Sequence, residues 1–285
     1  MEQSEKHSPG MEELLEGRFS LTKESLHGLS RKEFLLLADS CEHAGRFEDM
    51  ILILLTYIES CSHPVKMEDE ERTLLSLAFK GIVKPLREAN ISLTEVLKIE
   101  STAENVKKNL LVVRERVLHE LYSTCEAFIH LVESNVLLET AFQDADAIIW
   151  AYKTVGDHRR YEAELLLDTS TSPSSPTSAQ SSISTAKYNS KEARERAQTA
   201  FSEGWGEAQT RLKPTSILRL SLALNFAMFC YEIEKDENKA KEIAQDALDA
   251  AETEMTSLSS SDTHLPDTEH IIRILRQTLS QWNKS

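Results

Sequence analysis

Apolar residues recur three and four positions apart along almost the whole chain. One such stretch carries Leu75, Ala78, Phe79, Ile82 and Leu86, and this spacing places side chains on one face of an α-helix. Only 8 glycines and 7 prolines interrupt the 285 residues, well below average usage. No alternating run bounded by turn residues predicts a strand. The sequence therefore predicts an all-α protein.

The helical pattern covers most of the chain and leaves polar segments between and around its helices. Helices are predicted at residues 30–45, 47–61, 68–99, 103–133, 138–167, 189–209, 215–235, 237–258 and 266–283. We expect residues 1–29 to form a polar N-terminal extension outside the main fold, residues 30–283 to form a single helical domain, and residues 284–285 to form a short tail. Residues 168–187, rich in Ser, Thr and Pro, cannot supply a core face and are expected to form an inserted loop.

Composition and motifs exclude several classes of function. A formal charge of −15 argues against nucleic-acid binding, no apolar run is long enough for a membrane span, and the polar amino end is not a signal peptide. Scattered cysteines indicate reduced thiols and a cytoplasmic protein. No nucleotide-binding, zinc-protease or nucleophile motif is present, so we expect no enzyme and no cofactor. Cys41 and His43 point apart on a helix, so we expect no metal site.

Two predicted helices each carry cations at a spacing of two turns. Lys80 and Arg87 are seven residues apart, and so are Lys153 and Arg160, which Tyr161 follows. Arginine suits phosphate because its planar fork donates two parallel hydrogen bonds. A solvated face explains either helix alone, whereas the two together could surround one anion. The spacing is compatible with a phosphate site but does not establish it.

A lone amide interrupts the apolar run LRLSLALNFAMFCYEI at residues 218–233. This residue is Asn225, and Glu232 lies on the same face seven residues later. A buried amide without partners costs about 1–3 kcal/mol. Either other helices satisfy Asn225, or it faces a cleft where the backbone of a ligand pairs with it. Trp282, near the end of the last helix, likewise needs an acceptor for its indole N–H.

Four stretches in order resemble one known family: ERTLLSLAFK (71–80), YKTVGDHRRYEAE (152–164), RLSLALNFAMFCYEI (219–233) and IIRILRQTLSQW (271–282). Over residues 30–283 the chain is similar to the 14-3-3 family, as a divergent member. The resemblance implies nine antiparallel helices forming a cup-shaped bundle with an amphipathic groove. It also implies a non-enzymatic adaptor that binds phosphoserine or phosphothreonine peptides of partner proteins and pairs into a homodimer or a heterodimer with a related chain.

The resemblance also assigns roles to individual residues of this chain. The phosphate site falls on Lys80, Arg87, Arg160 and Tyr161. The peptide groove falls on Lys153, Leu224, Asn225, Glu232, Ile271, Ile274, Thr278 and Trp282. The dimer interface falls on Ala44, Arg46, Asp49, Arg116 and Glu120, with ion pairs Arg46–Glu120 and Asp49–Arg116. Since Arg160 is assigned to the phosphate, its neighbour Arg159 is expected to face solvent.

Several positions depart from the family pattern. Ile91 stands where the family has a further arginine beside the phosphate, and Asn90 stands where it has a tryptophan. Pro85 lies between Lys80 and Arg87, where it is expected to kink the helix and displace Arg87. Other departures are Thr278 for an asparagine, His270 and Gln281 for groove leucines, and Ser40 and Val113 at the interface. We therefore predict phosphopeptide binding that is weakened or altered in selectivity, and a weaker or differently docked dimer. The alternative is a helical interaction scaffold whose groove has lost phosphopeptide binding.

Overall fold

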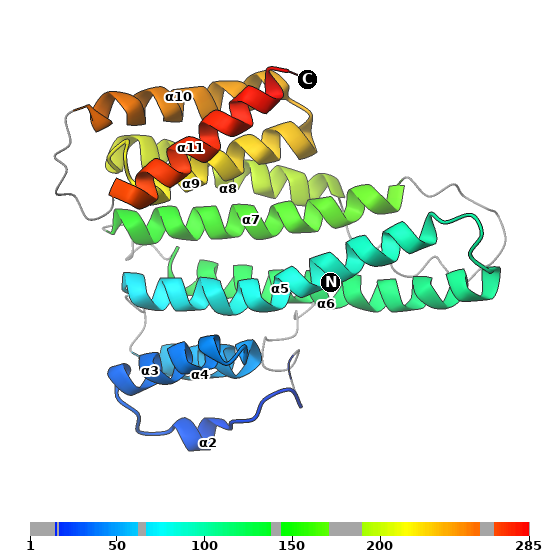
Figure 1. Ribbon diagram of the computed structural model, residues 1–285. Helices are drawn as coiled ribbons and strands as arrows, with labels where there is room; N and C mark the ends of the chain where they lie inside the picture. The colour runs from blue at the N-terminus through cyan, green and yellow to red at the C-terminus, as the bar shows by residue number, and fades with distance from the viewer. Residues whose placement is uncertain are drawn as a thin grey trace, which may run out of the picture. The chain divides into compact units, whose positions relative to one another are not determined.

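The regular structure of the protein is helical (Figure 1). The computed structural model describes residues 15, 17–61, 67–137, 144–170, 190–256 and 265–284. No strand occurs within these ranges, which confirms the predicted all-α class. None of the helices in this described part is both long enough and apolar enough to cross a membrane. Helix α7 reaches Ser170, and the rest of the predicted loop at residues 168–187 lies outside the described residues.

Contacts divide the chain into two compact units, Met1–Leu138 and Glu139–Ser285. The described part of the first unit contains α2 (Lys23–Leu26), α3 (Arg31–His43), α4 (Phe47–Ser60), α5 (Asp69–Leu97) and α6 (Glu104–Asn135). The described part of the second contains α7 (Ala145–Ser170), α8 (Ser190–Arg211), α9 (Ile217–Phe229), the π-helical turn η3 (Cys230–Glu234), α10 (Glu237–Met255) and α11 (Leu265–Trp282). With α9 and η3 taken together, α3 to α11 correspond to the nine predicted helices. The boundaries of the single domain expected at residues 30–283 stay a prediction.

The first unit is built on close contacts between α4, α5 and α6. The rings of Phe79 on α5 and Phe128 on α6 stack with their centroids 3.6 Å apart. Gly81 lets α5 approach α4, because a Cβ at this position would lie 2.2 Å from the ring of Phe47. Such contacts leave no room for a larger residue at position 81.

Helix α5 runs from Asp69 to Leu97 with Pro85 inside it. Pro85 has no N–H to donate to the carbonyl of Gly81 and its ring crowds that carbonyl. Figure 1 shows the second half of α5 inclined to the first, and we assign this bend to Pro85 because proline is the commonest cause of sharp kinks. The expected kink is thus a bend in a helix that continues through the proline.

Leu15 and residues 17–29 do not lie apart from the fold. Leu15 and Leu26 are each 1% exposed, and α2 contacts α4. The expectation that the extension lies outside the main fold is therefore wrong for these residues. The two leucines anchor the segment to the helices that follow, while its other described residues are exposed or half-buried.

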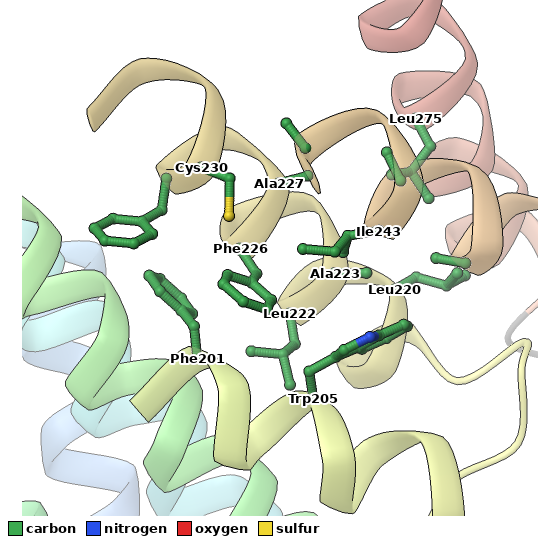
Figure 2. Close-up of a cluster of buried hydrophobic side chains, with 14 of the residues drawn as sticks. Phe201, Trp205, Leu220, Leu222, Ala223, Phe226, Ala227, Cys230, Ile243 and Leu275 are labelled. Carbon is green, nitrogen blue, oxygen red and sulfur yellow. The ribbon is translucent and has the colours of Figure 1, made fainter. Parts of the chain in front are cut away.

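The second unit has a core formed by α7 to α11, and Figure 2 shows its central side chains. Phe201 of α8 lies between Phe226 and Phe229 of α9, at centroid distances of 5.6 and 5.5 Å. Gly156 brings α7 against the same ring, since a Cβ there would lie 2.7 Å from Phe201. Phe201 thereby fixes the spacing of α7 and α9, the helices that carry the site described below.

The connection between α8 and α9 is held by a buried arginine. Arg219, 8% exposed, donates from Nη1 to the carbonyls of Leu212 at 2.8 Å and Gln209 at 3.3 Å. Its guanidinium lies 5.7 Å from the ring centroid of Trp205. These carbonyls belong to the C-terminal end of α8, where cations are favoured and acceptors are otherwise unsatisfied. Arg219 therefore ties the start of α9 to the end of α8.

Candidate functional site

A stripe of alternating charge runs along α7 in the second unit. It consists of Lys153, Asp157, Arg160 and Glu164, spaced four, three and four residues apart on one face. Lys153 Nζ lies 2.9 Å from Asp157 Oδ2, and Arg160 Nη1 lies 2.5 Å from Glu164 Oε1. Each cation is thus held by a carboxylate one turn further along the helix, which restricts the rotamers of both long side chains.

Asp157 is the centre of this arrangement. It is 7% exposed, and its two carboxylate oxygens accept hydrogen bonds from Asn225 Nδ2 on α9 at 2.7 and 2.8 Å. Burial by itself would raise the pKa of Asp157, but Lys153 and Arg160 hold it below its ordinary value. The carboxylate therefore stays ionised and joins α7 to α9.

The contact with Asp157 orients the amide of Asn225. Because a carboxylate only accepts hydrogen bonds, the NH₂ group of Asn225 must face Asp157. The carbonyl oxygen of the same amide makes no hydrogen bond to the described residues. Asn225 is half-buried, so its acceptor is available to an N–H donor such as a peptide backbone. Of the two possibilities left by the sequence, the structure shows a partner for the amide on another helix, and pairing of Asn225 with the backbone of a ligand stays a prediction.

Arg160 has a donor for which the described residues supply no acceptor. Its Nε is buried and finds no acceptor within the described ranges, while its guanidinium carbon lies 4.8 Å from the ring centroid of Tyr161. Burial lowers the pKa of Arg160, but Asp157 and Glu164 outweigh it and raise the pKa above the ordinary value. A buried N–H without an acceptor costs free energy, and an incoming oxyanion would supply the missing acceptor.

Tyr161 packs against a neutral histidine. The ring of His158 meets the ring of Tyr161 edge-on, with centroids 5.4 Å apart. His158 Nδ1 lies 2.8 Å from the carbonyl of Thr154, so this nitrogen carries the proton. Burial lowers the pKa of His158 to about 4, which keeps the ring uncharged at neutral pH. The packing restricts the ring of Tyr161 beside Arg160.

Arg159 does not face solvent, contrary to the expectation. It is 5% exposed, and its Nη1 lies 2.9 Å from Oε2 of Glu162, which is 1% exposed. Buried charges persist when they are paired on good geometry, and the spacing of three residues on one helix provides it. The signal in the sequence was Glu162 itself, three positions after Arg159. Of these two neighbouring arginines of α7, Arg159 thus forms a structural ion pair and Arg160 belongs to the candidate binding site.

The remaining groove residues of the second unit lie on α9, η3 and α11. Leu224, Ile271, Ile274 and Thr278 are half-buried, whereas Glu232 is exposed. Helix α9 contacts both α7 and α11, so these side chains belong to one group of packed helices. Trp282 is 6% exposed and stacks on Tyr231, with centroids 4.5 Å apart. The indole is therefore a mostly buried ring at the end of α11.

Lys80 and Arg87 belong to the first unit, on α5. Lys80 is exposed, Arg87 is half-buried, and Ile91, one turn further, is 53% exposed. Asn90 is buried and accepts a hydrogen bond from Arg114 Nε of α6 at 2.9 Å. Asn90, which stands at the position of the family's tryptophan, thus forms a polar contact between α5 and α6. The convergence of Arg87 with Arg160 and Tyr161 of the second unit stays a prediction.

Three of the residues assigned to a dimer interface, Arg46, Asp49 and Glu120, have ion-pair partners within the chain itself. Arg46 Nη2 lies 3.0 Å from Asp49 Oδ2, and Glu120 Oε1 lies 2.5 Å from Arg18 Nη1. Ala44 and Arg116 are exposed. The ion pairs expected between two copies stay a prediction, and Arg18 is a partner of Glu120 that the sequence did not indicate.

Asp157 is the residue of the site that sequence reasoning missed. The signal was its position on the stripe between Lys153 and Arg160, four residues from one and three from the other. Its contact with Asn225 joins residues 68 positions apart, which spacing on a single helix does not reveal. Within the described residues, no group of three histidine, cysteine or acidic side chains is placed to hold a metal ion.

Comparison with known proteins identifies the family. The family model for the 14-3-3 protein matches residues 37–283. The chain is 30% identical over 247 residues to 14-3-3 protein homolog 2 of Echinococcus multilocularis, covering 87% of this chain and 89% of that protein. It is 28% identical to 14-3-3-like protein F of Nicotiana tabacum, over 89% of this chain and 90% of that protein, and 28% identical to the 14-3-3 protein of Giardia intestinalis, over 89% and 93%. The chain belongs to the 14-3-3 family.

Proposed function

We propose that the protein is an adaptor that binds phosphoserine or phosphothreonine peptides of partner proteins in an amphipathic groove. Membership of the 14-3-3 family supports this role in general, since proteins of the family are non-enzymatic adaptors. The proposal assigns the phosphate to Lys80, Arg87, Arg160 and Tyr161. It assigns the peptide to Lys153, Leu224, Asn225, Glu232, Ile271, Ile274, Thr278 and Trp282.

The observation that carries the proposal is the network around Asp157. Beside it lie the guanidinium of Arg160, whose buried Nε finds no acceptor among the described residues, and the carbonyl of Asn225, which accepts no hydrogen bond from them. A phosphate oxygen would accept from Arg160, and a backbone N–H of the same peptide would donate to Asn225. A phosphorylated peptide supplies both groups on one molecule.

We further propose that affinity or selectivity differs from that of typical family members. Ile91 offers no cation where the family has an arginine, and Pro85 bends α5 between Lys80 and Arg87. A hydrogen bond to a charged group contributes about 1.5–3 kcal/mol. Losing one such contact weakens binding about tenfold or more, which a site with several remaining cations tolerates.

The proposal is tested by titrating the full chain with a phosphoserine peptide and with its unphosphorylated twin. We expect preference for the phosphorylated peptide, weakened by salt. Arg160→Lys keeps the charge but removes the planar fork, so affinity should fall about tenfold or more. The matched control is Arg196→Lys, an exposed arginine that also pairs with a glutamate four residues away, and it should bind like the wild type.

Two results would contradict phosphopeptide binding. One is equal affinity for the phosphorylated peptide and its twin. The other is an unchanged affinity in the Arg160 variant. The second candidate function is a helical interaction scaffold that does not bind phosphopeptides, and the exposure of Ile91 and the bend at Pro85 favour it. Capture of partner proteins that phosphatase treatment does not reduce would support this scaffold.

We also propose that the chain forms a dimer, with itself or with a related chain, through the face of Ala44, Arg46, Asp49, Arg116 and Glu120. Family membership supports dimerisation in general. Sedimentation at micromolar concentration that shows only monomer would contradict the dimer. A cytoplasmic location completes the proposal and is supported by four cysteines that remain thiols.

A further inference from the structure

The segment ahead of α3 is bound to the first unit by polar contacts as well as by its leucines. Two backbone N–H groups, of Ser20 and Leu21, donate to Asp49 Oδ1 at 2.5 and 3.3 Å. Arg46 holds the other oxygen, with Nε and Nη2 at 3.1 and 3.0 Å from Oδ2, and its Nη2 also donates to Ser20 Oγ. Asp49 is 3% exposed, and both of its carboxylate oxygens accept hydrogen bonds from donors of the same chain.

These contacts keep Asp49 ionised although it is buried. Burial raises the pKa of Asp49, but the N–H of Ser20 and the guanidinium of Arg46 outweigh it, and the pKa lies below its ordinary value. Loss of these partners while Asp49 stays buried would leave an uncompensated desolvated charge, which is strongly destabilising. The N–H groups of Ser20 and Leu21 thus help to stabilise the buried, ionised carboxylate of Asp49.

A second contact connects the same segment to α6. Arg18 Nη1 lies 2.5 Å from Glu120 Oε1, and both side chains are partly exposed. Glu120 lies on one stripe of α6 with Val113 and Arg116, at spacings of three and four residues. Val113 is 51% exposed. Arg18 therefore covers the acidic end of this stripe and leaves its apolar end open.

We propose that Leu15 and residues 17–22 form an intramolecular strap that competes with a second copy of the chain for Arg46, Asp49 and Glu120. The inference rests on the dimer face proposed above. In that dimer Glu120 would face Arg46 of another copy, whereas here Arg18 takes Glu120 and Ser20 shares Arg46. Both halves of the expected intermolecular pair are satisfied within one chain. Figure 1 shows α2, which continues the strap, in dark blue, and α2 contacts α4.

The strap lowers the affinity of dimerisation without removing its driving force. A second copy must displace Arg18 from Glu120 before it can use that carboxylate. Exposed apolar residues of α6, such as Val112 and Val113 at 63% and 51%, still favour burial against a partner. The oligomeric state is therefore set by competition between an intramolecular contact and an intermolecular one.

The experiment compares two cation deletions in the full chain by sedimentation over a concentration series. Arg18→Ala removes the contact with Glu120 and should lower the dimer Kd by up to about fivefold, the upper end of the range expected for a partly exposed ion pair. The matched control is Lys23→Ala, whose ammonium lies 2.7 Å from Glu59 of α4, outside the proposed face. It should leave the dimer Kd unchanged. An Arg18 variant that dimerises no more tightly than the wild type, or a control that gains as much, would overturn the proposal.

A second measurement establishes that the strap acts within one chain. Hydrogen exchange of the Ser20 and Leu21 amides should be slow and independent of protein concentration, because both donate to Asp49 of the same chain. Protection that disappears on dilution would assign the contact to a second copy and overturn the intramolecular strap. Phosphopeptide titration of both variants reports on the groove separately. Loss of the proposed phosphopeptide binding is thus distinguishable from failure of the strap.

Discussion

Asp157→Asn tests the network on which the candidate site depends. The substitution changes the volume little, but it removes the charge and converts one acceptor oxygen into an NH₂ donor. Asp157 accepts from Lys153 at 2.9 Å and from Asn225 at 2.7 and 2.8 Å. In the variant a new donor faces an ammonium or an amide NH₂, and neither of these can accept.

The expected cost follows from those contacts. A hydrogen bond to a charged group contributes about 1.5–3 kcal/mol, and a buried donor left without an acceptor costs about 1–3 kcal/mol. The asparagine keeps one acceptor oxygen, so only part of the network is lost. We expect the free energy of unfolding at pH 7 to fall by about 2–4 kcal/mol. Phosphopeptide affinity should fall as well, because Lys153 and Asn225 lose the group that orients them.

The pH dependence separates this effect from a packing defect. Because the folded pKa of Asp157 lies below the ordinary value, its stabilisation is fully present above about pH 4, the unfolded value for aspartate. It is lost as the pH falls through the lower folded pKa. The gap in stability between wild type and variant should therefore be constant above about pH 4 and narrow below it.

Urea unfolding between pH 7 and pH 3 measures this gap. Asp246→Asn serves as the control, since Asp246 is an exposed carboxylate in the middle of α10, and it should change the free energy of unfolding by less than about 0.5 kcal/mol. An Asp157 variant as stable as the wild type would refute the reasoning. A gap that stays the same down to pH 3 would show that the loss does not come from the ionised carboxylate.

Three further substitutions test other parts of the structure by urea unfolding. Since the pKa of His158 is about 4, the wild type should lose about 2–4 kcal/mol as the pH falls from about 6.5 to 4, because only the unfolded chain gains the proton. His158→Gln should abolish this loss, and a wild type without it would refute the assignment. Gly156→Ala should cost about 1–3 kcal/mol by overpacking, because its Cβ would meet Phe201 at 2.7 Å; no cost would mean that the ring moves freely. Asn90→Ala should cost about 1–3 kcal/mol by removing the acceptor of Arg114 Nε; an unchanged stability at pH 7 would show that this pair contributes nothing.

Periodicity predicted the long helices because each of them buries one face over many turns. The four residues of α2 give no such period, since one turn presents too few apolar positions. Its start is encoded instead by a capping box between Thr22 and Ser25, and its position is fixed by burial of Leu26. Both signals are too short to distinguish a helix from a turn without the helix α4 against which α2 packs.

The sequence predicts the candidate site in two ways only: by the spacing of residues on a single helix and by the resemblance to a family. Spacing placed Lys153 and Arg160 on one face, but it does not tell which helix faces them. The partner of Asp157 is Asn225, and the choice between an unsatisfied amide and a paired one depends on the packing of α9 on α7. That packing is set by Gly156, the residue before Asp157, and by Phe201 of α8, which is far from both Asp157 and Asn225 in the sequence.

Arg159 shows why residue type alone misleads. Assigning Arg160 to the phosphate leaves solvent as the expected environment of Arg159, although a charged residue can be fully buried when it is paired. Neighbouring residues on a helix point about 100° apart, which leaves Arg160 on the site and turns Arg159 toward Glu162. Residues three positions apart lie on nearly the same face of a helix, so Arg159 and Glu162 can be buried together as an ion pair.

The acidic residues Asp49 and Glu120 extend this argument from one helix to the whole assembly. Family resemblance pairs them with arginines of a second copy, and the structure pairs them with donors from residues 18–21 and Arg46 of the same chain. One carboxylate oxygen cannot accept full-strength hydrogen bonds from both partners. Each contact that holds the strap therefore lowers the affinity of the proposed dimer. If both sets of contacts compete as proposed, the proposed dimer should respond to changes at Arg18, a residue that lies ahead of the family domain at residues 37–283.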